Sequence, residues 1–151
     1  MCSSDLDLAV QPWQGALSSS TNALVSYPLL VDAEGRTRTQ AADRRWLATR
    51  SFVAQDRDGA IVIGTTRDGF FSLDRLAAFL RDSPLGLRLA LNLDGGPLAC
   101  QAVVAAGFER RFCGDWETQV RGGELHLLGR LMGDRPWGLP LILAAYPKDD
   151  R

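Results

Sequence analysis

Lysine is nearly missing from this chain: Lys148 is the only lysine among 17 basic residues, and all the others are arginine. With 18 acidic residues the formal net charge is -1, so the chain has no general positive field of the kind that attracts nucleic acid. Arginine presents a planar fork of donors that suits phosphate and carboxylate groups. A codon bias toward arginine is the simpler explanation for most of them, so we interpret only an arginine inside a motif as functional.

Cysteine and histidine are scarce as well. Cys2, Cys100 and Cys113 are odd in number and lack C-x-x-C spacing, which gives little support to a zinc site or a thioredoxin-type redox site. Cys100 and Cys113 would close a short disulfide loop in an exported protein; two separate buried thiols are the alternative. His126 has no nucleophile pattern near it, so we expect a structural or surface role.

Long apolar runs are absent too. None approaches the roughly 20 residues that a membrane helix needs, so no membrane-spanning segment is predicted. Residues 1–6 have neither the basic nor the apolar region of a signal peptide. Their Cys-Ser-Ser-Asp-Leu stretch is also what one frame of a widely used sequencing-adapter oligonucleotide encodes. We therefore expect residues 1–21 to be a non-native or loop leader, and residues 149–151 to be a tail.

What the chain does contain is enough apolar sequence for one domain, since 46% of its 151 residues are hydrophobic. Two β-rich runs, residues 51–55 and 60–64, are joined by Asp-Arg-Asp-Gly, which predicts a hairpin. Strands are also expected within residues 23–31 and 139–146. Residues 98–106 fit a strand or a short helix, and we favour the strand.

One helix is predicted at about residues 72–82. Ser72 is a typical N-cap, and apolar residues recur at i, i+3, i+4 and i+7 across residues 73–81. Residues 107–138 are rich in glycine and are expected to be mostly loop. Together these elements predict an α+β fold with a mixed, mainly antiparallel sheet and one clear helix.

The main candidate for chemistry is Asn92-Leu93-Asp94-Gly95-Gly96. Residues 87–93 alternate as a strand does and run directly into the glycines, which leave room for backbone amides to cradle an anion. By strand alternation, Asn92 and Asp94 should point to the same face. Taken alone, Asp-Gly-Gly is more often an ordinary turn.

From residue 22 onward, the order of features resembles that of phosphodiester glycosidases, the family that includes the enzyme uncovering mannose 6-phosphate on lysosomal glycoproteins. The resemblance covers about residues 22–148, which we interpret as the C-terminal portion of the family domain, an incomplete one. The stretches that carry it are Ala-Leu-Val-Ser-Tyr-Pro-Leu-Leu-Val at 23–31, Thr-Arg-Ser-Phe-Val-Ala at 49–54, the helix, Leu-Asn-Leu-Asp-Gly-Gly-Pro at 91–97, and the segment from Leu-Pro at 139 to Tyr-Pro at 146.

The resemblance implies a hydrolase that cleaves the sugar–phosphate bond of glycosyl phosphodiesters or related envelope glycans. Arg50 would hold the phosphate, although a structural salt bridge is an equal alternative. Asp94 would stabilise the sugar cation, act as a base toward water or hold a divalent cation. Asn92 would bind sugar hydroxyls or fix the Asp94 carboxylate.

The backbone of Gly95 and Gly96 and the hydroxyls of Ser51 and Thr65 are further substrate-binding candidates. Relatives are typically exported or membrane-anchored, which implies an extracytoplasmic location. Relatives usually have serine where Leu98 stands here. That difference motivates the alternative, a catalytically impaired module that binds carbohydrate or phosphate on the same scaffold.

Overall fold

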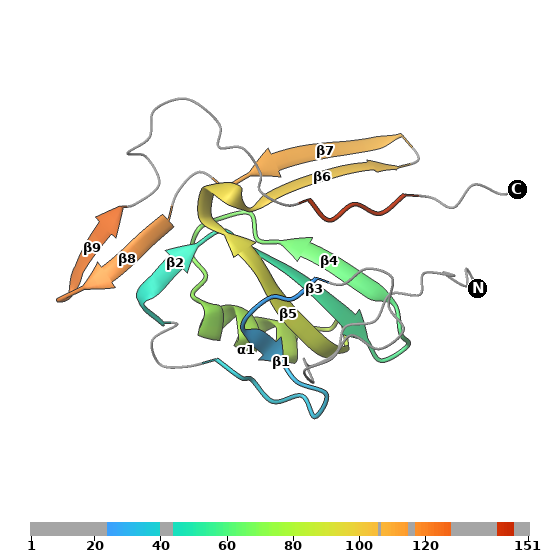
Figure 1. Cartoon of the computed structure of the whole chain (residues 1–151), viewed down its shortest axis with the longest axis horizontal. Coiled ribbons are helices and arrows are strands. Elements are labelled where there is room, and N and C mark those ends of the chain that lie inside the picture. The colour runs from blue at the N-terminus through green and yellow to red at the C-terminus, as the bar shows by residue number, and fades with distance from the viewer. Residues whose placement is uncertain (1–23, 40–43, 106, 115–116, 128–141, 147–151) are drawn as a thin grey trace, which may run out of the picture.

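The fold is built mainly from antiparallel strands. The computed structural model describes residues 24–39, 44–105, 107–114, 117–127 and 142–146. Within these ranges the strands form three separate sheets, every strand pairing is antiparallel, and there is one α-helix (Figure 1). The expected α+β class is therefore wrong. The protein is mainly β, because much of the stretch that we expected to be loop is paired in strands.

The largest sheet has four strands in the order β1-β5-β3-β4. They are β1 (Leu29–Val31), β5 (Leu87–Gly95), β3 (Arg50–Asp56) and β4 (Ile61–Thr65). The predicted hairpin is confirmed as β3–β4, whose turn contains Gly59 at a φ of 88°. The predicted strand at 87–93 is confirmed as β5, which continues two residues further into Asp-Gly.

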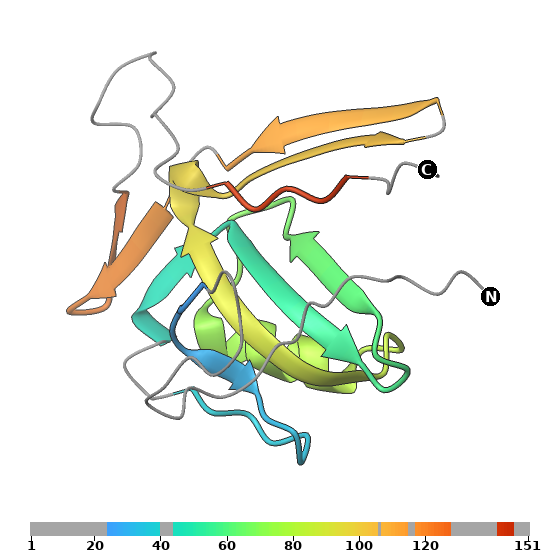
Figure 2. The same ribbon diagram turned by 45° about the vertical axis from the view of Figure 1, so that its right-hand side comes forward.

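One face of this sheet is covered by α1 (Leu73–Asp82), as Figures 1 and 2 show. The predicted helix is confirmed, with Ser72 at its N-cap. Its apolar face is buried because the i, i+3, i+4 pattern points one stripe of side chains at the sheet. The core between helix and sheet consists of Leu30, Val31, Phe52, Ala54, Leu76, Ala77, Leu80, Leu87 and Ala90.

The other two sheets come largely from the region that we expected to be loop. The three-stranded sheet contains β2 (Trp46–Ala48), β8 (Glu117–Arg121) and β9 (Glu124–Leu127). The two-stranded sheet contains β6 (Cys100–Ala105) and β7 (Phe108–Cys113). The preference for a strand within residues 98–106 is thus confirmed.

Turn glycines explain why the loop prediction failed. Gly107 stands between β6 and β7 at a φ of 82°, and Gly122 and Gly123 stand between β8 and β9 at 59° and 86°. Such angles favour glycine and are typical of tight hairpin turns. The glycines therefore separate short strands and do not indicate an extended loop.

Two further expectations concern the end of the chain and the cysteines. Residues 142–146 belong to no strand, so the predicted final core strand fails there; residues 139–141 lie outside the described residues. Cys100 and Cys113 form a disulfide, which resolves the choice between a bond and two thiols. They stand directly opposite each other in the β6–β7 register. No helix among the described residues has the length and apolarity to cross a bilayer.

Candidate active site

The site is built where β3 begins and β5 ends. Arg50 is the register partner of Gly95, and the amide of Gly96 donates to the carbonyl of Thr49 at 2.9 Å. A β-carbon on Gly95 would lie 3.1 Å from Nη1 of Arg50 and 3.2 Å from the Thr49 carbonyl oxygen. The guanidinium therefore lies against the Asp-Gly-Gly segment, in space that a larger residue would occupy. The structure thus brings two predicted components, Arg50 and the glycines, together.

Arg50 is buried, with 7% of its surface exposed. Its Nε donates to the carbonyl of Phe71 at 3.1 Å, and its Nη2 donates to the carbonyl of Trp46 at 2.9 Å. Its backbone amide donates to Oγ1 of Thr66 at 2.9 Å. The two side-chain bonds fix the orientation of the guanidinium. Its positive charge is therefore already in place before any ligand binds.

Asp94 is exposed, and its Oδ1 accepts a hydrogen bond from the amide of Gly95 at 2.8 Å. β5 has one extra residue here: three steps separate Asn92 from Gly95, whereas two separate their partners Phe52 and Arg50. A bulge of this kind interrupts strand alternation. The argument that Asn92 and Asp94 must share a face therefore does not hold through this segment.

Asn92 is buried beside the chain that leads into β1. Its Nδ2 donates to the carbonyl of Tyr27 at 3.2 Å, and its backbone amide donates to the carbonyl of Pro28 at 3.1 Å. Its Oδ1 is buried and has no hydrogen-bond partner among the described residues. The structure thus places the Asn92 amide against residues 27–28.

Ser51 and Thr65 face each other across β3 and β4, with their hydroxyl oxygens 3.3 Å apart. Because side chains alternate along a strand, Ser51 points away from the face that carries Arg50. The neighbouring residue Thr66 contacts Arg50, because its Oγ1 accepts the hydrogen bond from the Arg50 backbone amide.

Sequence reasoning missed Glu117, the first residue of β8. Gly96 has a φ of 64°, and a β-carbon there would lie 3.0 Å from Oε2 of Glu117. Burial raises the pKa of the Glu117 carboxyl, the positive charge of Arg50 lowers it and the negative charge of Asp94 raises it, and the net pKa lies above the ordinary value. Glu117 was overlooked because it falls in the stretch that we expected to be loop.

Gly114, the residue after β7, packs closely against this arrangement. A β-carbon there would collide with the carbonyl oxygen of Gly96 and would lie 2.8 Å from Cβ of Thr49. Its amide donates to the carbonyl of Ala99 at 3.0 Å. Gly114 therefore lies in close contact with the Asp-Gly-Gly segment, and β8 begins three residues after it.

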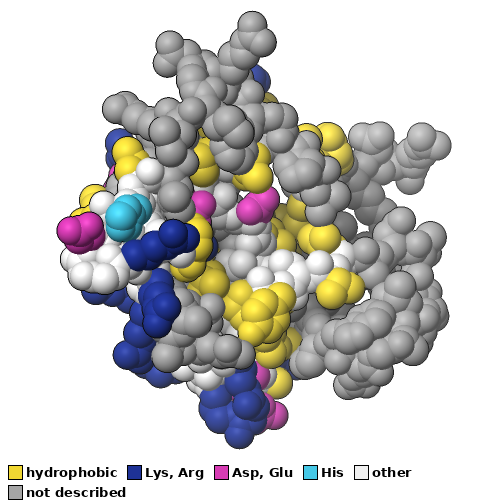
Figure 3. Space-filling view, turned by 60° about the vertical axis from the view of Figure 1, so that its left-hand side comes forward, with side chains coloured by type: hydrophobic (Ala, Val, Ile, Leu, Met, Phe, Trp, Pro, Cys, Tyr) yellow, Lys and Arg dark blue, Asp and Glu magenta, His cyan; other side chains and the backbone are white. Residues whose placement is uncertain are grey.

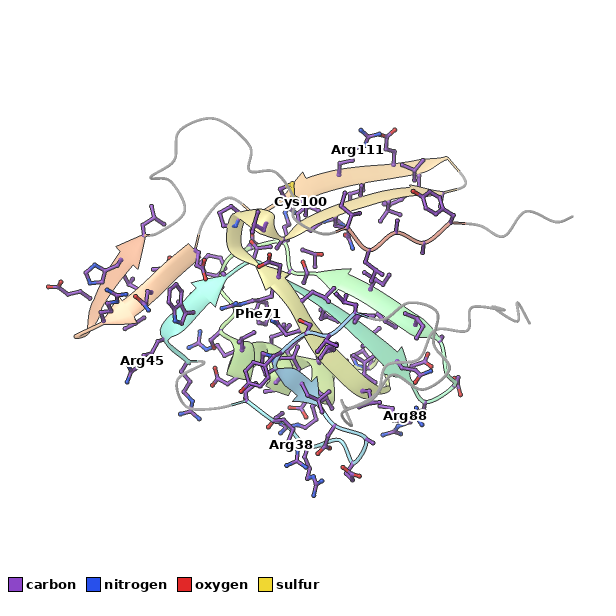
Figure 4. The ribbon with its side chains drawn as sticks, viewed as in Figure 1. Arg38, Arg45, Phe71, Arg88, Cys100 and Arg111 are labelled. Atoms are coloured by element: carbon purple, nitrogen blue, oxygen red, sulfur yellow. A yellow bond between two sulfur atoms is a disulfide. The ribbon has the colours of Figure 1, made fainter. Side chains whose placement is uncertain are left out.

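The surroundings distinguish this site from the other charged surfaces. On the face shown in Figure 3, basic side chains gather toward the left and lower left, and some acidic side chains lie near the middle, away from them. In Figure 4, Arg38, Arg45, Arg88 and Arg111 lie at the edges of the molecule, while Phe71 lies well inside. No group of three or more His, Cys, Asp or Glu residues within the described ranges is placed to hold a metal ion. The divalent cation considered for Asp94 thus stays a prediction.

The sequence model of the phosphodiester glycosidase family matches residues 3–121. This range includes Arg50, the Asp-Gly-Gly turn and Glu117, and it ends with the last residue of β8. No curated protein and no solved structure matches the chain.

Proposed function

The chain belongs to the phosphodiester glycosidase family, and we propose that it hydrolyses the bond between a sugar and the phosphate of glycosyl phosphodiesters. The observation that carries this proposal is the meeting of a fixed guanidinium, an exposed carboxylate and two glycines at one sheet end. Envelope glycans that contain the same linkage are within the proposed substrate class.

The reaction requires charge stabilisation at two places. Cleavage of the anomeric C–O bond leaves positive charge on the sugar and adds negative charge to the departing phosphate. A phosphate monoester is a good leaving group, so a cation that holds it matters more than a strong proton donor. A complementary arrangement therefore needs a positive group on the phosphate side and a carboxylate on the sugar side.

Arg50 meets the first need. A guanidinium pairs with phosphate oxygens through short, charge-assisted hydrogen bonds. Two carbonyls already orient this side chain, and Nη1 lies against Gly95. The amides of Gly95 and Gly96 already donate to Oδ1 of Asp94 and to the Thr49 carbonyl, so the two glycines stay predicted substrate-binding residues and Arg50 carries the phosphate contact in this proposal.

Asp94 meets the second need. It is exposed at the end of β5, and the Gly95 amide holds its carboxylate. We assign it to stabilising the sugar cation. Ser51, Thr65 and Asn92 stay predicted substrate-binding residues. Their observed partners, the facing hydroxyl and the Tyr27 carbonyl, are compatible with positioning the strands that carry Arg50 and Asp94.

We propose an extracytoplasmic location. The Cys100–Cys113 disulfide supports it, since such bonds persist in oxidising compartments and are rare in the cytosol.

The proposal is tested with a panel of hexosyl 4-nitrophenyl phosphodiesters, in which released 4-nitrophenyl phosphate is measured through added phosphatase. Arg50→Lys and Asp94→Asn should each lower kcat/KM by about 10²-fold or more, because each removes charge stabilisation made in the transition state. Asp58→Asn is the matched control. It changes an exposed turn residue about 20 Å along β3 from Arg50 and should leave kcat/KM unchanged.

The result that would overturn the proposal is full turnover by both site variants, or no turnover by the unaltered protein on any member of the panel. Binding of the diesters without turnover would indicate the binding module instead. Chelation with EDTA in the same assay tests the predicted divalent cation.

A further inference from the structure

We infer that Glu117 is the general base that deprotonates the attacking water, because its carboxylate stands over Gly96 beside the segment that carries Asp94. This inference rests on the proposed hydrolysis and assigns a residue that the Asp-Gly-Gly motif does not contain.

Three contacts place the Glu117 carboxylate there. In the β2–β8 register Glu117 is opposite Ala48, so its backbone lies next to the residues that lead into Arg50. The missing side chain of Gly96 leaves the space that Oε2 of Glu117 approaches. Gly114, three residues before Glu117, packs against the Gly96 carbonyl. The register with Ala48 and the space left at Gly96 thus place the Glu117 carboxylate.

A base suits this reaction better than an acid. The Glu117 carboxylate takes one proton from water while the water oxygen forms a bond to the anomeric carbon. The anomeric C–O bond breaks, and its electron pair leaves on the phosphate monoester. Glu117 ends as the carboxylic acid, the sugar gains a hydroxyl, and the proton later passes to solvent. No further reactant is needed.

The environment of Glu117 also favours a base. Burial raises its pKa, Arg50 opposes that shift and Asp94 adds to it. A carboxylate with a raised pKa is a stronger proton acceptor, and two nearby carboxyl groups in different environments can take different roles. Arg50 and Asp94 are the charged groups of the described residues that act on it. Activity should rise with pH through the raised pKa and be lost below it, where Glu117 is protonated.

The test uses Glu117→Gln in the full chain with the same diester panel. We expect kcat to fall by about 10²- to 10⁴-fold with little change in KM, and the acidic limb of the pH profile to disappear. Azide, a nucleophile that needs no deprotonation, should restore turnover and give the glycosyl azide plus the phosphate monoester. Glu124→Gln, on an exposed position of β9, is the matched control and should match the unaltered protein.

Fold integrity is checked by thermal unfolding. Because the folded protein holds the Glu117 proton more tightly than the unfolded chain, the ionised carboxylate opposes folding near neutral pH. Glu117→Gln should therefore unfold at the same temperature or higher. If it does not fold, Glu117→Asp gives a second test, with reduced kcat and a retained acidic limb.

Unchanged kcat in folded Glu117→Gln, or loss of kcat that azide does not restore, would reject the base assignment while leaving the proposed hydrolysis intact. Absence of turnover in the unaltered protein would instead reject the proposed function.

Discussion

At the scale of single residues, environment decides which arginine matters. Arg50 is the only buried arginine among the described residues, and two of its side-chain donors, Nε and Nη2, bond to main-chain carbonyls. Arg36 and Arg38 are exposed and pair with Asp32. Exposed ion pairs contribute little to stability. Asp32, the carboxylate that both arginines share, is buried, so we expect it to contribute more to the stability of the fold.

Asp32 provides the first prediction at this scale. Burial by itself would raise the pKa of Asp32, but hydrogen bonds from the Arg36 amide and from the Arg38 and Arg36 guanidinium groups outweigh it and hold the pKa far below its usual range. A depressed acid pKa stabilises the fold above the unfolded value of about 3.9. That stabilisation is lost as the pH falls toward the folded pKa.

Asp32→Asn should therefore lower the free energy of unfolding at pH 7, measured by urea titration, and the difference from the unaltered protein should narrow below about pH 4. Asp82→Asn is the control. Asp82 pairs with exposed Arg81 on the surface, and its loss should have little effect. A difference for Asp32→Asn that stays constant down to pH 2 would contradict the ionic explanation.

At the scale of elements, short strands depend on local supports. An isolated two-stranded hairpin is marginal in water, and much of β6–β7 is exposed. The Cys100–Cys113 disulfide joins the two strands at the end nearest the Asp-Gly-Gly turn, as the position of Cys100 in Figure 4 shows. The same end carries Gly114, which packs on Gly96. The disulfide therefore lies at the end of the hairpin that packs against the candidate site.

Replacing both cysteines, Cys100→Ser with Cys113→Ser, should lower the free energy of unfolding by about 3 kcal/mol, since the bond links two residues that are 13 apart in sequence. Dithiothreitol should have a comparable effect on the unaltered protein and none on the double variant. Denaturation monitored by circular dichroism measures both. Equal stability of the oxidised and reduced protein would show that the bond does not support the hairpin.

At the scale of the whole molecule, the candidate site is where three sheets meet. Arg50 and Asp94 come from the four-stranded sheet, Glu117 comes from the three-stranded sheet, and the short 3-10 helix Gly96–Leu98 leads into the two-stranded sheet. A ligand held by all of these groups would bind only the assembled fold. Binding should therefore stabilise the entire domain.

Inorganic phosphate, a mimic of the leaving group, should raise the thermal unfolding temperature of the unaltered protein. The gain corresponds to about 2.7 kcal/mol at a concentration 100 times Kd. Arg50→Met should lose this gain, whereas Arg88→Met, at an exposed position of β5 (Figure 4), should keep it. Sodium chloride at matched ionic strength controls for screening. Equal gains in all three proteins would show that phosphate does not bind at Arg50.

The sequence by itself determined the elements that depend on neighbours along the chain. Three elements could be predicted because each is set by local geometry. They are the helix α1 with its 3.6-residue pattern, the Asp-Gly turn between β3 and β4, and the alternating strand β5 that runs into Asp94. The order of these motifs also identified the family. The mainly β class was missed because glycines that mark hairpin turns look like loop glycines in a linear sequence.

Only the tertiary structure decided which groups meet. The burial of Arg50, its register with Gly95, and the approach of Glu117 to Gly96 all depend on contacts between segments that are not neighbours along the chain. The extra residue between Asn92 and Gly95 likewise becomes visible only against its partner strand. Strand register is set by packing over the whole domain, so no local pattern carries that information.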